Sequence, residues 1–260
     1  MAAKKVLFLI DDTSESLKTL LFAARYFNPQ TTHLTFFTPF TSENSFEPSR
    51  PSEVFRFLIT SGVKEGVLSS SEFNRLSDTL ENFVAYVHNL DKIGKEAKSH
   101  LMSHFSFCDL IIGAPGAFDF WNTQSMNYEG RPGGLKIKLS GECCDEINRI
   151  VILNDGSDQS LGTIQEFSRL FNDTFVKTEI NLLITNPDYR ADDQVHIVRF
   201  LHAHFKNLAY HVLSGEEPHK LRSYLGVNDN TLILNVEGTN MPLVKKYFTG
   251  DNLARLSNIY

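Results

Sequence analysis

The feature of this 260-residue sequence that most constrains its fold is an alternation of short apolar runs with longer segments of helical period. The short runs are rich in β-branched and aromatic residues, as strands are, and apolar residues recur at steps of three and four in the segments between them. Parallel strands need a crossover connection, which is usually a helix. The alternation therefore predicts an α/β fold built on parallel sheets.

The alternation occurs twice, in the same order of elements. The first apolar run of each half ends in the pattern Asp-x-Ser, at Asp12 in the first half and at Asp155 in the second, and a helical segment follows each time. Such self-similarity indicates a repeated structural unit. We therefore expect two units of one kind, comprising residues 1–146 and 147–260.

The same pattern assigns the strands and helices of both units, with Ser14 as the expected cap of the first helix. The expected strands are residues 5–10, 32–40, 84–88 and 108–112 in the first unit and 149–153, 179–184, 209–213 and 231–236 in the second. The expected helices are residues 17–27, 72–83 and 92–105 in the first unit and 160–171, 193–204 and 218–225 in the second.

The first unit is longer than the second, mostly because of residues 41–70. Residues 41–52 are rich in Ser, Glu and Pro, which predicts a loop, and a short helix is expected to start near residues 55–58. Insertions of this kind are tolerated best at the surface, so we expect this region to lie there.

A fifth strand is uncertain in both units. Residues 134–139 alternate as a strand does, but they could equally end a helix, and the second unit closes with a helix-like segment at 252–257. A sheet without a fifth strand would leave an edge that must be paired or covered. A homodimer and an intramolecular pseudo-dimer are the two arrangements that would do so.

Charge and cysteine content exclude several classes of function. The formal net charge is -6, whereas nucleic acids and anionic membranes attract clustered basic surfaces. No apolar stretch is long enough to span a bilayer. The three cysteines are too few and too unevenly spaced for a disulfide framework or a zinc site, which favours a reducing compartment. We expect a cytoplasmic protein with neither nucleic acid nor membrane as a partner.

Two segments carry a resemblance to a known family. They are the turn Asp-Gly-Ser-Asp-Gln-Ser160 after the first strand of the second unit, and Cys-Asp-Leu-Ile-Ile-Gly-Ala-Pro-Gly116 late in the first. The chain resembles the universal stress protein family in a tandem arrangement. The resemblance implies Rossmann-like (adenine nucleotide alpha hydrolase-like) units with a five-stranded parallel sheet. In the nucleotide-binding members it also implies ATP, with magnesium, across the carboxyl ends of the strands.

The resemblance also implies which residues would form the nucleotide sites. The aspartate after the first strand would meet the adenosine, and a Gly-x-x-Gly after the fourth strand, followed nine residues later by Gly-Ser or Gly-Thr, would wrap the phosphates. Glycines allow the backbone to approach a phosphate, and N–H groups at a helix start face the anion. The matching positions are Asp12, Gly113, Gly116, Asp155, Gly156, Ser157, Gly238 and Thr249.

Both phosphate loops depart from the family pattern. In the first unit Met126 stands where a glycine is expected, and Asp119 would place a carboxylate near phosphate. In the second unit Asn235 replaces the first glycine, Phe248 replaces a later one, and Glu237 adds negative charge. We therefore expect eroded sites and a non-enzymatic regulatory scaffold of the stress-response type, with slow ATP hydrolysis at most.

An alternative keeps a nucleotide in the second unit, as an ATP-binding signalling protein. Its support is the intact Asp155-Gly156-Ser157 turn, with Lys245 and Lys246 near the second loop. The simpler interpretation is that Asp12 and Asp155 cap the helix that follows them or close its turn. No pairing of a nucleophile with a base occurs in the sequence, so no catalytic residue is assigned.

Two further groups of residues invite hypotheses. Phe118, Phe120 and Trp121 fall in an expected loop, where an exposed aromatic cluster could contact a protein partner of unknown identity. His100 and His104 share a helix face near Cys108, which is a weak metal pattern because no third ligand on that helix is specified. We expect a packed helix face there and no metal.

Overall fold

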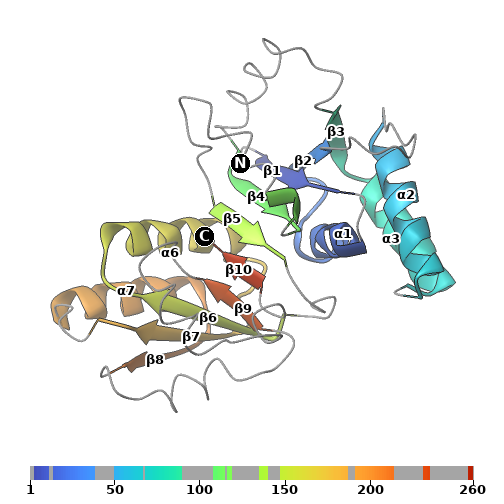
Figure 1. Ribbon diagram of the computed structural model, residues 1–260. Coiled ribbons are helices and arrows are strands. Elements are labelled where there is room, and N and C mark those ends of the chain that lie inside the picture. Colours follow the sequence, from blue (N-terminus) through green and yellow to red (C-terminus); the bar gives the residue numbers. More distant parts are fainter. Residues whose placement is uncertain are drawn as a thin grey trace, which may run out of the picture. The chain divides into compact units, whose positions relative to one another are not determined.

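The computed structural model describes residues 3–11, 14–38, 50–66, 68–89, 108–114, 116–118, 135–139, 147–186, 191–213, 231–234 and 257–259 (Figure 1). The chain divides into unit 1, Met1–Leu139, and unit 2, Ser140–Tyr260. The sequence places this boundary between residues 146 and 147. The two boundaries differ by segment 140–146, which lies outside the described residues.

Unit 1 contains a parallel sheet with helices. Its strand order is β3-β2-β1-β4-β5, and every described pair of neighbours is parallel. The elements are β1 (Lys4–Leu9), α1 (Ser14–Tyr26), β2 (Thr32–Thr38), α2 (Pro51–Lys64), α3 (Ser70–Glu81), β3 (Val84–Asn89), β4 (Leu110–Gly113) and β5 (Leu135–Lys138).

Unit 2 repeats this order as β8-β7-β6-β9-β10, again with parallel neighbours. Its elements are β6 (Arg149–Asn154), α6 (Asp158–Phe171), β7 (Glu179–Ile184), α7 (Ala191–His204), β8 (Asn207–Val212), β9 (Thr231–Leu234) and β10 (Ser257–Ile259). The α/β fold with parallel sheets, predicted from the alternation, is confirmed. The expected helices 92–105 and 218–225 lie outside the described residues.

The first strand of each unit is central and almost wholly buried, which explains its unbroken apolar sequence. Residues 6–10 of unit 1 and 150–153 of unit 2 are at most 2% exposed. Strands that have helices on both faces of a parallel sheet read as continuous apolar runs and not as alternating ones. This is why the two first strands are the easiest elements to assign from sequence.

Helix α2 differs most from the sequence prediction, which assigned a loop and a short helix. It spans Pro51–Lys64, and its buried face recurs at helical steps through Val54, Phe55, Leu58, Ile59 and Gly62. The ring of Phe55 packs edge-on against Phe36 of β2 at a centroid distance of 5.1 Å. A Cβ on Gly62 would clash with Leu17 of α1, so glycine permits close packing of the two helices. The insertion is therefore part of the core of unit 1.

The edge strands β5 and β10 settle the question of a fifth strand. Residues 135–138 form β5, parallel to β4, so the strand interpretation of that segment is correct. In unit 2, residues 257–259 form β10, parallel to β9. The helix-like pattern expected over 252–257 is therefore wrong at residue 257, whereas residues 252–256 lie outside the described part. Within the described residues, no helix has the length and apolar character needed to cross a membrane.

Candidate functional site

The carboxyl ends of the central strands define one candidate site in each unit. In unit 1 the chain leaves β1 toward β2 on one side, and β4 pairs with β1 on the other. Unit 2 has the same arrangement at β6, between β7 and β9. Ligands of open α/β sheets bind where the strand order reverses in this way. The residues that follow β1, β4 and β6 are therefore the first to consider.

In unit 2 the turn after β6 is closed by the carboxylate of Asp155. Its Oδ1 atom accepts hydrogen bonds from the Ser157 N–H at 3.0 Å, the Ser157 hydroxyl at 2.7 Å and the Ser160 hydroxyl at 2.6 Å. The Ser157 Oγ in turn accepts the Ser160 N–H at 3.1 Å and caps helix α6. Asp155 thus closes the turn, as the simpler interpretation states, while the helix cap is Ser157.

Two neighbours of Asp155 shape the same turn. Gly156 has a φ angle of +82°, a conformation that glycine adopts without steric cost. Its N–H donates to the Oδ1 atom of Asn154 at 3.0 Å. Asn154 is fully buried, and within the described part of the chain its Nδ2 group has no hydrogen-bond partner. A buried donor without a partner is uncommon and marks this position for explanation.

In unit 1 the corresponding aspartate is Asp11. The Ser16 hydroxyl donates to its Oδ1 atom at 2.7 Å, and the Asp11 N–H donates to the Ser16 Oγ at 2.9 Å. Asp11 and Ser16 are five residues apart, as are Asp155 and Ser160. The pairing of Asp12 with Asp155 is therefore out by one residue. Asp12 itself lies outside the described residues.

Gly113 and Gly116 lie where the chain leaves β4. A Cβ on Gly113 would be 2.7 Å from the Cβ of Leu9 and 2.9 Å from its carbonyl oxygen, so this glycine allows β4 to pack against β1. A Cβ on Gly116 would be 3.3 Å from the Asp11 Oδ2 atom. The structure thus brings Gly116 and the Asp11 carboxylate together, and it gives Gly113 a packing role.

Phe118 follows in a short helical turn and corrects the proposal of an exposed aromatic cluster. It is 4% exposed and packs in a cluster with Leu7, Leu9, Phe37, Ile111 and Ala117. Its N–H donates to the carbonyl of Ala114 at 3.0 Å. Phe118 is therefore a core residue. Its expected companions Phe120 and Trp121 lie outside the described residues, as do Gly238 and Thr249 of the second phosphate loop.

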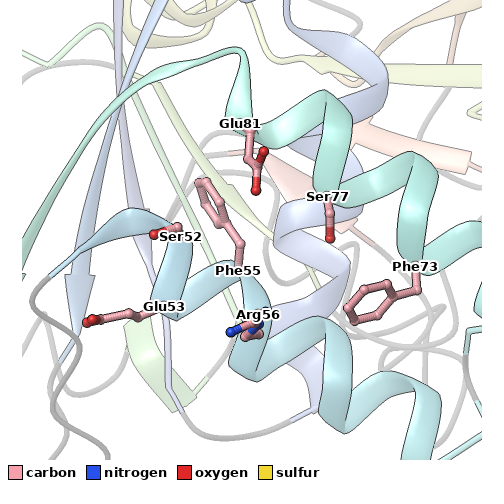
Figure 2. Close-up of a pocket in the computed structure, with 7 residues that line it drawn as sticks. All are labelled: Ser52, Glu53, Phe55, Arg56, Phe73, Ser77 and Glu81. Carbon is pink, nitrogen blue, oxygen red and sulfur yellow. The ribbon is translucent and has the colours of Figure 1, made fainter.

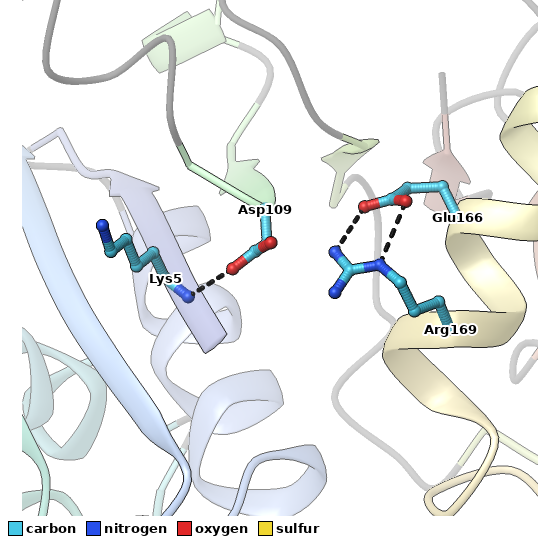
Figure 3. Close-up of polar contacts among 4 residues, drawn as sticks. All are labelled: Lys5, Asp109, Glu166 and Arg169. Carbon is cyan, nitrogen blue, oxygen red and sulfur yellow. Dashed lines mark hydrogen bonds and ion pairs between the residues drawn. The ribbon is translucent and has the colours of Figure 1, made fainter. Parts of the chain in front are cut away.

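Cys108 precedes β4, and its side chain is partly buried. Burial, followed by the negative charge of Asp109, raises its pKa to about 11. The Asp109 carboxylate accepts the backbone N–H of Lys5 at 2.8 Å and ties the start of β4 to β1 (Figure 3). The raised pKa disfavours the thiolate, which is the form that binds metals and attacks electrophiles. In the described part of the chain, no cluster of three metal-binding side chains occurs; His100 and His104 lie outside it.

Sequence reasoning missed the roles of Asp11, Ser16 and Asn154. A signal for the first two was present, because aligning the halves on Ser16 and Ser160 places Asp11, not Asp12, opposite Asp155. Matching the shorter Asp-x-Ser pattern concealed this alignment. No signal in the sequence identifies the unpartnered amide of Asn154, because hydrogen-bond partners depend on the folded structure.

Comparisons with known proteins bear on the fold. No protein-family model matches the sequence, and no curated protein matches it. Among solved structures, a universal stress protein from Archaeoglobus fulgidus DSM 4304 is 10% identical, with a TM-score of 0.55 over 98% of this chain and 97% of that chain. A protein of unknown function from Pseudomonas aeruginosa PAO1 is 12% identical, with a TM-score of 0.47 over 99% and 92% of the two chains. At such low identity the first of these likenesses concerns architecture alone: this chain has the fold of a universal stress protein.

Proposed function

We propose that the chain is a regulatory protein of the universal stress protein type that acts through protein contacts and not by catalysis, and that unit 1 does not bind nucleotide. The observation that carries the proposal is the packing of Phe118 directly after β4. A phosphate loop at this position needs free N–H groups and space for the anion. Here the Phe118 N–H is bonded to Ala114, and its ring fills the core beside Leu9.

The charge in unit 1 supports the same proposal. The Asp11 carboxylate lies beside Gly116, at the position where a Gly-x-x-Gly loop would receive phosphate. A phosphate bound at Gly116 would be repelled by the Asp11 carboxylate unless a cation lay between the two anions. Gly113 and Gly116 are the remaining marks of a phosphate loop, and the missing side chain of Gly113 is explained by contact with Leu9. Unit 1 thus has the fold of a nucleotide-binding unit with its site closed by the chain's own residues.

A second candidate function, ATP binding in unit 2, is favoured by the buried amide of Asn154. Its Nδ2 donor has no partner among the described residues, and it lies at the carboxyl end of β6, next to Asp155. A buried donor left without a partner costs about 1–3 kcal/mol, which a ligand acceptor could recover. Asn154 and the Asp155 turn would then hold the nucleoside part, and ATP would bring its magnesium with the phosphates.

The stoichiometry of ATP binding tests the proposal. Isothermal titration of the full chain with ATP and magnesium should give either no binding or one ATP per chain, since unit 1 is closed. Two ATP molecules per chain would overturn the proposal. A single site that is lost in Asn154→Leu and kept in Asp11→Asn would establish the second candidate function for unit 2. Circular dichroism of both variants verifies that they fold.

A further inference from the structure

A pocket in unit 1 includes the last turn of α3, which leads to the amino end of β3. It is formed between helices α2 and α3, the region in which unit 1 has more sequence than unit 2, and its volume is about 370 Å³ (Figure 2). Pockets of a few hundred Å³ are typical of small-molecule sites. The lining residues used below are Phe55 and Arg56 from α2 and Phe73, Ser77 and Glu81 from α3.

The pocket carries opposite charges on its two walls. Arg56 belongs to α2 and Glu81 to the last turn of α3, and both side chains are exposed. Within the described residues, neither side chain forms an ion pair or a hydrogen bond. Glu53, at the rim, differs because its carboxylate accepts the N–H of Arg50 at 3.2 Å. The pocket therefore presents one cation, Arg56, and two carboxylates, Glu53 and Glu81, of which Glu81 has no partner within the described residues.

The position of Glu81 at the end of α3 strengthens the attraction of its carboxylate for a cation. The last turn of α3 contains no basic residue, so the partial negative charge of the helix end adds to the carboxylate. Arg56 opposes a ligand that carries only positive charge, and Glu81 opposes one that carries only negative charge. A ligand with both charges satisfies both walls.

The remaining lining of the pocket consists of two aromatic residues, Phe55 and Phe73, and of Ser52, Glu53 and Ser77. Phe55 is 4% exposed, and Phe73 is half-buried on the helix that also carries Ser77 and Glu81. Aromatic rings provide apolar contact area for a side chain of similar character. The body of the ligand is therefore expected to be apolar.

We propose that this pocket binds a free α-amino acid with an apolar side chain. The ligand's ammonium group lies against Glu81, its carboxylate against the Arg56 guanidinium, and its side chain against Phe55 and Phe73. Arginine suits the carboxylate because its fork of N–H groups can donate twice. None of the residues that line this pocket follows β1, β4 or β6 directly, so the proposal can be tested independently of nucleotide binding.

The test removes each charge from the ligand and from the protein in turn. Ligand-observed NMR titrations of the full chain use L-leucine, leucinamide, which lacks the carboxylate, and isocaproate, which lacks the ammonium group. Exposed charge pairs contribute up to about 1 kcal/mol, so each analogue should bind on the order of fivefold more weakly than leucine. The variants are Glu81→Gln and Arg56→Gln, at exposed positions where the fold tolerates substitution.

The expected result is a crossed pattern. In Glu81→Gln, leucine and isocaproate should bind equally, because the partner of the ammonium group is gone. In Arg56→Gln, leucine and leucinamide should bind equally for the corresponding reason. Glu65→Gln, at an exposed glutamate beyond α2, is the matched control and should retain both preferences. Absence of saturable leucine binding, or an ammonium preference that survives in Glu81→Gln, would overturn the proposal.

Discussion

The turns after the first strands of the two units form the same aspartate–serine link in different surroundings. Asp155 accepts three hydrogen bonds at a glycine-containing turn, next to the buried amide of Asn154. Asp11 accepts a hydrogen bond from the Ser16 hydroxyl, and the residue before it is the buried Ile10. The link thus stabilises a strand-to-helix turn in both units. Because both units have the link, it does not indicate a ligand by itself. The clearest difference between the two turns is the residue before the aspartate, which is Asn154 in unit 2 and Ile10 in unit 1.

The largest expected effect comes from removing the ring of Phe118, which closes the candidate site of unit 1. Phe118→Ala should lower the free energy of unfolding of unit 1 by about 3–5 kcal/mol, as removal of a buried aromatic ring does. Hydrogen exchange with mass spectrometry should show lost protection in peptides of unit 1 and unchanged protection in unit 2. The half-buried Phe73→Ala is the control with a smaller loss. Unchanged exchange of residues 4–9 in Phe118→Ala would contradict the closed site.

The two aspartates themselves should differ in how much they stabilise their units. Asp155→Ala leaves the hydroxyl hydrogens of Ser157 and the buried Ser160 without their acceptor, and it should cost about 2–3 kcal/mol. Asp11→Ala removes one such acceptor and should cost about 1 kcal/mol. Urea unfolding of each variant measures the difference. Equal losses would show that the two turns are energetically alike.

Replacement of Gly113 and of Gly162 by alanine should change stability in opposite directions. Gly113→Ala would press a methyl group against Leu9, and overpacking of this kind should cost about 1–2 kcal/mol. Gly162 lies within α6, where an added Cβ meets nothing within 4 Å. Gly162→Ala should therefore stabilise unit 2 by about 0.5–1 kcal/mol through helix propensity. Thermal unfolding of both variants checks the signs, and a neutral Gly113→Ala would return that glycine to the candidates for phosphate binding.

The smallest expected effect concerns Cys108, which precedes β4. Because the folded-state pKa of Cys108 is raised to about 11, its protonated form contributes stability that is present below the ordinary thiol pKa of 9.0 and is lost as pH rises toward 11. In a Cys143→Ser, Cys144→Ser background, iodoacetamide should modify Cys108 more slowly in the native protein than in urea at pH 8. Equal rates would mean that the thiol is accessible and ionises normally.

Much of the fold is predictable because buried parallel strands carry their own signal. The predicted strand at 179–184 coincides with β7, and the strands at the starts of both units differ from β1 and β6 by one residue at their ends. Apolar runs of this kind can be recognised whatever loops connect them, because a strand that is covered on both faces must be apolar on both. Right-handed crossovers limit the possible strand orders without selecting one, so the order β3-β2-β1-β4-β5 comes from the structure.

The missed features depend on contacts between distant residues. The start of helix α2 is missed because the Ser-, Glu- and Pro-rich composition of residues 41–52 predicts a loop, although Pro51 and Ser52 begin the helix. Gly62, within the helix, is required by the close approach of Leu17. Phe118 was assigned to the surface because it follows a Gly-Ala-Pro-Gly segment, and only the fold shows the space beside Leu9 that it fills. Local composition cannot reveal a packing partner more than a hundred residues away in the sequence.

The central position of the first strand also has a consequence for biosynthesis. Strand β1 pairs with β2 on one side, but its other neighbour, β4, starts more than a hundred residues later, as the Lys5–Asp109 bond shows. At about 5–20 residues per second, a ribosome needs about 5–20 s to add that length of chain. During this interval one edge of the apolar part of β1 has no partner of its own. An unpaired apolar strand edge of this kind is prone to aggregation, so we expect the nascent chain to need protection until β4 is made.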